Sequence, residues 1–233
     1  MSEAEARHDY NETDIWKYPP FPPDARISPY YIFISCPGDV AKAYLNQIKG
    51  EIRTLFNAAN KKHRTIEILH WESDLSSGID SGGAQKKIDN SLIQKAHAVI
   101  AIFWTKLGTE TPVDGTIYRS GTTAEICTAV EHDKPTKILE LDCPVPTSRI
   151  DPKQLQKKNV YLRDVKKQTN MAVNTLSTEN FREKMLMEFS DACDEIDKGA
   201  KYKYTLYDKM NIRNVCIAKQ NSQKVNQIDK MRS

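Results

Sequence analysis

The segment AVIAIFW, Ala98–Trp104, is the most apolar stretch of the chain and decides the fold. Its apolar residues run on without polar alternation, which is typical of a parallel strand with both faces buried. We therefore predict that this segment forms the central strand of a sheet that is covered by helices on both sides.

Toward the N-terminus, two further apolar runs predict neighbouring strands. The first is YYIFIS, Tyr30–Ser35, and it stops at a Cys-Pro-Gly-Asp turn whose Asp39 is suited to cap the next helix. The second is IEILHW, Ile66–Trp71. The helix between them carries apolar residues at three- and four-residue spacing, which predicts one buried stripe: Leu45, Ile48, Ile52, Leu55 and Phe56.

Two long polar connections interrupt this pattern of strands and helices. Glu72–Gly83 leads into a helix expected at Gln85–Ala96, and Thr105–Ser120 leads into a helix expected at Thr122–His132. Both connections exceed the usual length of a strand-to-helix loop, and such loops often carry function.

The C-terminal half continues the alternation. We predict a fourth strand at Lys137–Leu141, a fifth at Asn159–Leu162, and a long helix at Thr178–Ile196. Strands that alternate with helices call for a parallel sheet with helices on both faces, so the expected fold is an α/β, flavodoxin-like three-layer sandwich with about five strands. Ligands of such folds bind outside the carboxyl ends of the strands.

Segments at both ends are expected to flank one α/β domain at residues 30–197. Residues 1–29 mix aromatic side chains with five prolines, which predicts an extended arm. Residues 198–233 carry nine Lys/Arg and two Asp, a charge of +7, which leaves −4 for residues 1–197. This basic tail is either a solvated appendage or the one segment suited to contact nucleic acid or an acidic partner.

Composition excludes several classes of protein. No apolar run approaches the ~20 residues that cross a bilayer, and the polar start is no secretory signal, so we expect no membrane association. The five cysteines are scattered, which argues against a disulfide framework and against a metal site. We therefore predict a reducing, cytoplasmic setting.

The segment RSGTTAEICTAVEHDKP, Arg119–Pro135, places one carboxylate, Glu125, in the first turn of a helix. One interpretation is structural: Thr122-x-x-Glu125 has the pattern of a capping box, in which Glu125 bonds the backbone of Thr122. The other is functional, because the helix begins at the ligand-binding edge of the sheet, where a carboxylate on a rigid element is well placed to act. The sequence leaves both interpretations open.

Four motifs in order give a family resemblance: YIFIS-C-P-G-D, IEILHW, AVIAIFW-x-K-x-G-T and SGTTAEI-x-x-A. Together they resemble the TIR-like and nucleoside deoxyribosyltransferase-like group, and most closely its bacterial TIR-like branch. The resemblance covers residues 30 to about 165, roughly 60% of the chain.

The resemblance implies that Glu125 is the catalytic residue. Glutamate at this place acts on the nicotinamide ribose of NAD in catalytic TIR domains, and it attacks a deoxyribose after an SGT turn in the deoxyribosyltransferases. One feature departs from the TIR pattern, since the Trp that often lies four residues before the glutamate is replaced by Gly121. Trp71 or Trp104, each expected at the end of a strand, would then supply the aromatic wall.

Other residues are expected to bind the substrate because they lie at the carboxyl edge of the sheet or beside Glu125. Cys36 is not expected to act as a nucleophile, since no histidine follows at a telling position. NAD is a substrate in this hypothesis, and no further cofactor is expected. The predicted binding residues are Ser35, Cys36, Trp71, Asp74, Trp104, Arg119, Ser120 and Thr122.

Three functions remain open at this point. The first is an NAD hydrolase or cyclase which, by resemblance, serves bacterial defence against phage or signalling and is activated by homo-oligomer assembly or by a partner protein. The second is a nucleoside or nucleotide N-glycosidase or deoxyribosyltransferase, which the SGT turn favours. The third is a non-catalytic TIR-like scaffold in which Glu125 only caps its helix.

Overall fold

The computed structural model describes residues 29–59, 64–74, 88–199 and 203–218 of the 233-residue chain. The predicted N-terminal arm therefore lies almost entirely outside the described residues, as do much of the loop at 72–83 and the end of the basic tail. Among the described residues, no helix is both long and apolar enough to cross a membrane.

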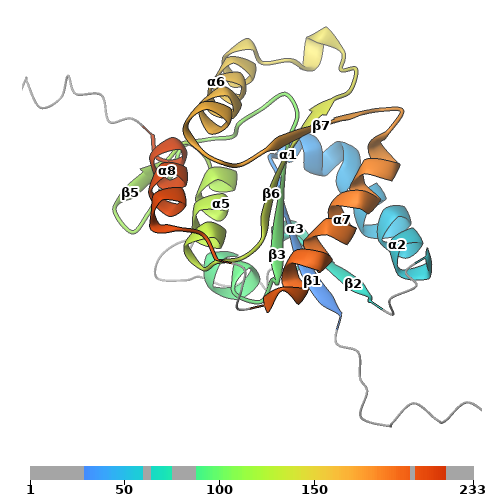
Figure 1. The fold of residues 1–233 in the computed structure, drawn as a ribbon. Helices are drawn as coiled ribbons and strands as arrows, with labels where there is room; N and C mark the ends of the chain where they lie inside the picture. The colour runs from blue at the N-terminus through green and yellow to red at the C-terminus, as the bar shows by residue number, and fades with distance from the viewer. Residues whose placement is uncertain (1–28, 60–63, 75–87, 200–202, 219–233) are drawn as a thin grey trace, which may run out of the picture.

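A central sheet of five parallel strands has the order β2-β1-β3-β6-β7, which confirms the predicted flavodoxin-like arrangement (Figure 1). The strands are β1 (Tyr30–Ser35), β2 (Ile66–Leu69), β3 (Ala98–Phe103), β6 (Thr136–Asp142) and β7 (Val173–Ser177).

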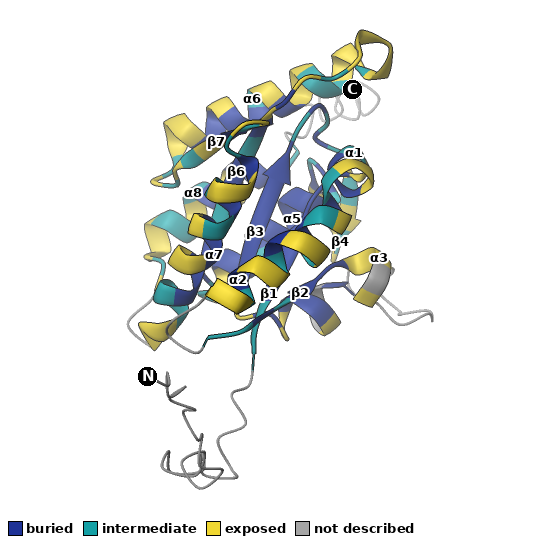
Figure 2. Cartoon of the chain, turned by 90° about the vertical axis from the view of Figure 1, so that its right-hand side faces the viewer, coloured by how far each residue is buried: buried dark blue, intermediate teal, exposed yellow. Residues whose placement is uncertain are grey.

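The central position of β3 was predicted and is confirmed. It pairs with β1 on one side and β6 on the other, and all six of its residues are buried. Figure 2 shows this strand as the buried middle of the molecule, with exposed residues on the outer faces of the surrounding helices and in the loops.

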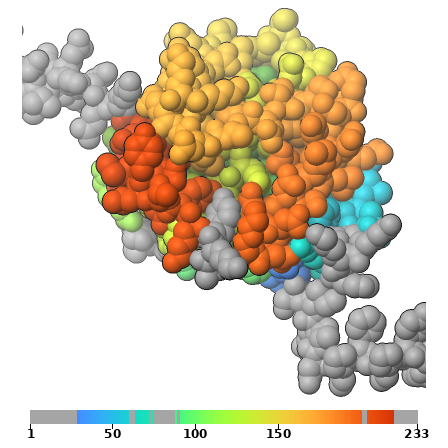
Figure 3. Space-filling view, in the orientation of Figure 1, coloured from blue at the N-terminus to red at the C-terminus, as the bar shows by residue number. Residues whose placement is uncertain are grey.

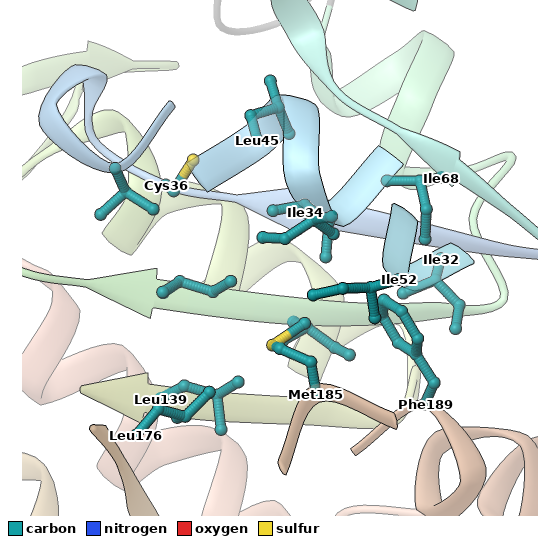
Figure 4. Packing of buried hydrophobic residues seen from close by; sticks show 14 of the residues in the cluster. Ile32, Ile34, Cys36, Leu45, Ile52, Ile68, Leu139, Leu176, Met185 and Phe189 are labelled. Atoms are coloured by element: carbon teal, nitrogen blue, oxygen red, sulfur yellow. The ribbon is translucent and has the colours of Figure 1, made fainter. Parts of the chain in front are cut away.

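One layer of helices covers the sheet face on which Ile34 and Leu139 lie. It consists of a helical stretch over residues 38–59 and of α7 (Phe181–Asp197), whose Met185 and Phe189 pack against it (Figure 4). The stretch over residues 38–59 is made of α1 (Gly38–Val40), η2 (Ala41–Leu45), η3 (Ile48–Ile52) and α2 (Arg53–Ala59).

The predicted stripe of the first helix is right except at Leu55. Ile48, Ile52 and Phe56 are buried as expected, whereas Leu55 is 39% exposed. Both η2 and η3 are π-type turns, which are wider than α-helical turns. From Ile48 onward the buried positions follow a four-residue spacing, Ile48, Ile52 and Phe56, and Leu55 is turned out to solvent.

The second layer lies on the opposite face of the sheet and contains α5 (Gly121–Glu131), α6 (Pro152–Gln168) and α8 (Leu206–Cys216). A short helix, η4 (Asp89–Ile93), extends this layer over β1 and β3. Ile88, Leu92 and Ile93 are buried in one cluster with Phe33 of β1 and Val99 of β3. Of the helix predicted at 85–96, residues 88–93 are helical, the helix ends three residues earlier than predicted, and residues 85–87 lie outside the described ranges.

The predicted fifth strand is wrong, because Asn159–Leu162 lies within α6. Asp151 caps this helix with hydrogen bonds from the backbone of Lys153 and Gln154, and Pro152 occupies its first turn. A run of four residues is too short to separate strand from helix by pattern alone. The fifth strand is β7, an edge strand in which only Leu176 is buried.

Several smaller boundaries also differ from prediction. β2 ends at Leu69, and Trp71 begins a short helix, α3 (Trp71–Asp74). The connection at 105–120 is not a plain loop, since it contains a hairpin of β4 (Thr111–Val113) and β5 (Thr116–Tyr118). A 3-10 turn, η5 (Thr147–Arg149), precedes α6.

The helix α8 lies in the segment that was predicted to be a basic tail. Ile212, Val215 and Cys216 are almost completely buried against α5 and α6. Figure 3 shows α8 beside α6 on the surface of the molecule. After α8, residue Ile217 forms a bridge to Tyr118, so residues 206–217 are part of the folded domain.

Candidate active site

The carboxyl ends of β1 and β3 mark the point where the sheet topology reverses. After β1 the chain covers one face of the sheet with the helices at 38–59, and after β3 it covers the other face with α5. The two connections diverge here, and such a divergence is the usual ligand-binding position of doubly wound sheets. The predicted residues Ser35 and Cys36 lie at this point, as expected.

Glu125 is not a capping residue, so the predicted capping box with Thr122 is wrong. Ser120 is the N-cap of α5: its hydroxyl accepts from the backbone N–H of Thr123, and the Thr123 hydroxyl accepts from the backbone N–H of Ser120. Thr122 lies inside the helix and is buried. The helix-capping role, which was the alternative to a catalytic role for Glu125, is thus filled by Ser120 and Thr123.

The Glu125 carboxylate instead meets the end of β1. Its Oε2 accepts a short hydrogen bond from the hydroxyl of Ser35, and the two residues are 4% and 0% exposed. A carboxylate in such a dry environment interacts more strongly with nearby positive charge than it would in water. The structure therefore brings together two of the predicted site residues.

Asp39 was predicted to cap the first helix and does not. Pro37 is the N-cap residue, and Asp39 points across to β3, where its Oδ2 accepts from the backbone N–H and the hydroxyl of Thr105, at 2.9 and 2.7 Å. Its Oδ1 is buried and has no hydrogen-bond partner in the part of the chain that the structure describes. An unpaired buried carboxylate oxygen is costly, which makes Asp39 a candidate to accept from a ligand.

Cys36 is buried beside these carboxylates and lies 3.7 Å from Nε2 of His70. Burial raises the pKa of the Cys36 thiol far above its usual value, and the negative charges of Glu125 and Asp39 raise it further. A thiol in such an environment is protonated at neutral pH. The sequence argument about Cys36 assumed that no histidine lies near it, and His70 is that neighbour. Burial also lowers the pKa of His70 to about 4, so its ring is neutral.

The two tryptophans have different surroundings. Trp104 follows β3, donates its indole N–H to the backbone oxygen of Cys143 at 3.0 Å, and packs edge-on against Tyr44. Trp71 is 39% exposed at the start of α3, with its ring tilted against His70. Trp104 is thus a fixed wall of the ligand edge, whereas Trp71 presents an open face to solvent.

Asp74 and Arg119 are engaged with other parts of the fold. Asp74 forms an ion pair with Lys49 at 2.8 Å and accepts from the backbone N–H of His70. The Arg119 guanidinium pairs with Asp164 of α6 at 3.0 Å and donates from Nε to the backbone oxygen of Ile217. These contacts do not bring either side chain to Ser35 and Glu125.

A cavity of about 390 Å³ adjoins the site at the carboxyl ends of β3, β6 and β7. Trp104 and Thr105 form one wall, so the cavity begins beside the bridge between Thr105 and Asp39. Its other side holds Lys158, which is 4% exposed and pairs with Glu140 at 2.7 Å. The volume is within the range of pockets that bind small molecules.

Sequence reasoning missed Thr105 and His70 and gave Asp39 another role. Part of the signal was present, because Thr105 follows the strand predicted at Ala98–Trp104 and Asp39 belongs to the turn after β1, whereas His70 was placed inside a predicted strand that in fact ends at Leu69. The carboxyl ends of parallel strands meet at one edge of the sheet, so polar residues just past each strand converge there.

No group of three or more His, Cys, Asp and Glu side chains within the described ranges is arranged to hold a metal ion. No protein-family model matches the chain, and no curated protein matches its sequence.

Proposed function

We propose that the protein cleaves the N-glycosidic bond between nicotinamide and ribose in NAD, with Glu125 as the catalytic carboxylate. The observation that carries this proposal is the hydrogen bond between Ser35 and Glu125 at the topological switch point of the sheet. This hydrogen bond holds a buried carboxylate on a rigid helix at the position where ligands of this fold class bind. The carboxylate is not needed as a helix cap, because Ser120 caps α5.

The chemistry suits a single carboxylate. Nicotinamide leaves as a neutral molecule when the bond to C1′ breaks, so the leaving group needs little protonation, unlike that of most glycosides. The ribose becomes an oxocarbenium-like cation, which the dehydrated Glu125 carboxylate stabilises directly or traps as an ester. Attack by water gives ADP-ribose, and attack by a nucleophile within the same molecule gives a cyclic product.

Asp39 and the cavity beside Thr105 complete the proposed binding site. The unpaired Oδ1 of Asp39 accepts a hydroxyl of the ribose, while Thr105 holds the other carboxylate oxygen in place. The cavity beyond Thr105 provides room for the part of the dinucleotide away from nicotinamide. Asp39→Asn replaces the charged acceptor, and we expect it to raise KM for NAD at least about tenfold; an unchanged KM would remove Asp39 from the site.

The proposed setting follows from the resemblance to the bacterial TIR-like branch. We infer that the activity serves defence against phage or signalling, and that assembly of several copies or a partner protein switches it on. An isolated chain is then inactive until it assembles, so the oligomeric state has to be recorded in each assay.

The test is a product assay by mass spectrometry on the full chain at high concentration. NAD and a panel of nucleosides are supplied separately to the unmutated protein, to Glu125→Gln and to a control variant, Glu131→Gln. Glu131 lies at the other end of α5, where it pairs with Arg213, so the control makes the same chemical change away from the site.

We expect nicotinamide from the unmutated protein and from Glu131→Gln, and none from Glu125→Gln. Free bases from the nucleoside panel would replace the proposal by the glycosidase or deoxyribosyltransferase alternative, which the turn at Ser120-Gly121-Thr122 favours. Absence of any product from a confirmed assembly would favour the scaffold.

A further inference from the structure

A second cavity of about 370 Å³ lies outside the Glu125 site. It is formed by one side of α6, by the connection after β3, by Arg119, which precedes the N-cap residue of α5, and by the chain after α8. It shares no lining residue with the group formed by Ser35, Asp39, Thr105 and Glu125. Its volume is sufficient for a small organic ligand.

Positive charge predominates on the wall of this cavity. Arg119, Lys157 and Arg163 line it together with two carboxylates, Glu110 and Asp164, so three cations against two anions leave +1. Asp164 is shared between the two arginines, at 3.0 Å from Arg119 and 3.6 Å from Arg163. Lys157 has no hydrogen-bond or ion-pair partner in the described part of the chain.

The rest of the cavity offers apolar surface. Leu107 and Val160 line it, and Leu107 is almost completely buried. An adjoining hollow around the same side of α6 is lined by Ile150, Pro152 and Leu155. A ligand that combines an anionic group with a planar or apolar part would therefore satisfy both kinds of surface.

We propose that this cavity binds a small phosphate-bearing molecule of the nucleotide type, independently of the Glu125 site. Arginine forks and a nearby ammonium group are the usual partners of phosphate oxygens. The phosphate lies between Arg119, Lys157 and Arg163, and it relieves the mutual repulsion of these cations. The base or sugar packs on Val160 and the neighbouring apolar residues.

Arg119 also gives the cavity a direct connection to α5. Its backbone N–H donates to the backbone oxygen of Cys216, its side chain is held by Asp164, and the next residue, Ser120, caps α5. A ligand that competes with Asp164 for Arg119 therefore acts on the junction from which the helix of Glu125 begins.

The experiment measures binding of three probes, ADP, inorganic diphosphate and adenosine, to the full chain by calorimetry. The test variant is Lys157→Glu/Arg163→Glu, in which two exposed cations of the cavity are reversed. The control is Lys153→Glu/Lys167→Glu, an equal charge reversal at exposed positions of α6 that do not line the cavity.

We expect ADP and diphosphate to bind the unmutated protein and the control, and the test variant to lose at least about tenfold in affinity. ADP should also slow hydrogen exchange of the backbone amides in residues 107–123. Binding to Glu125→Gln should be unchanged, so a failure of the NAD proposal leaves this one standing. Equal weakening in both double variants, or adenosine binding as tightly as ADP, would overturn the proposal.

Discussion

Ser35 and Glu125 are 90 residues apart in the chain, and their side chains meet in the interior. Replacing Ser35 by Ala removes the hydroxyl donor from a buried carboxylate, and we expect the free energy of unfolding to fall by about 1–3 kcal/mol. Glu125→Gln keeps an amide oxygen that accepts from Ser35, so its cost should be smaller. Urea denaturation of both variants checks this, and an unchanged stability of Ser35→Ala would contradict the hydrogen bond.

His70 gives a pH dependence of stability. Its pKa is lowered to about 4, first by burial and then by the charge of Lys49, whereas an unfolded histidine titrates near 6.5. Between these values the unfolded chain binds more protons, so the free energy of unfolding rises with pH in this window and reaches its full value above it. The stability lost when the pH falls below both pKa values is about 3 kcal/mol.

The measurement is urea denaturation at pH 7 and at pH 5 for the unmutated protein and for His70→Gln. We expect the unmutated protein to lose more stability on acidification than the variant does. His97, whose pKa is also lowered by burial, is present in both proteins, so the difference isolates His70. Equal losses in the two proteins would show that His70 is not buried in its neutral form.

At the scale of elements, the start of α5 offers two neighbouring threonines with different roles. The buried Thr123 hydroxyl accepts from the backbone of Ser120 and is within hydrogen-bonding distance of the backbone oxygens of Ser120 and Cys216. The Thr122 hydroxyl has no hydrogen bond to any of the residues that the structure describes. Thr123→Val should therefore cost about 1–3 kcal/mol of unfolding free energy, since it leaves a buried N–H unpaired.

Thr122→Val is the matched control, with the same exchange of hydroxyl for methyl one position earlier. We expect it to change stability by less than about 0.5 kcal/mol. Thermal or chemical unfolding of both variants distinguishes the Ser120/Thr123 capping box from a Thr122/Glu125 capping box. A larger loss of stability in Thr122→Val than in Thr123→Val would favour the second capping box and, with it, a structural role for Glu125.

At the scale of the whole molecule, α8 closes the layer formed by α5 and α6. Ile212 is 1% exposed in this layer, while Met210, two residues earlier, is 56% exposed. Ile212→Ala should lower the free energy of unfolding by about 2–4 kcal/mol through lost burial and the cavity left behind. Met210→Ala should change it by less than about 0.5 kcal/mol. A similarly small loss of unfolding free energy at both positions would show that α8 is not packed into the folded domain.

Continuous apolar runs made the core elements predictable. β1 and β3 have the expected bounds to within one residue, and α7 matches the helix predicted at Thr178–Ile196 to within three residues. Such runs depend on local composition, because a strand buried on both faces has to be apolar throughout. Weaker patterns failed: α6 was read as a strand in part, and β7 is too polar to be recognised.

The sequence by itself determined the class of fold and the place of Glu125, because a parallel sheet covered by helices, with its ligand edge at the carboxyl ends of the strands, follows from the alternation of apolar strands with helices. It did not determine what Glu125 does, since Ser120 and Thr122 are both hydroxyl residues followed three positions later by a suitable capping partner. Only the tertiary structure decided between them. It brought Ser35 to Glu125 and Thr105 to Asp39 across the sheet, and contacts between distant residues leave no local pattern in the sequence.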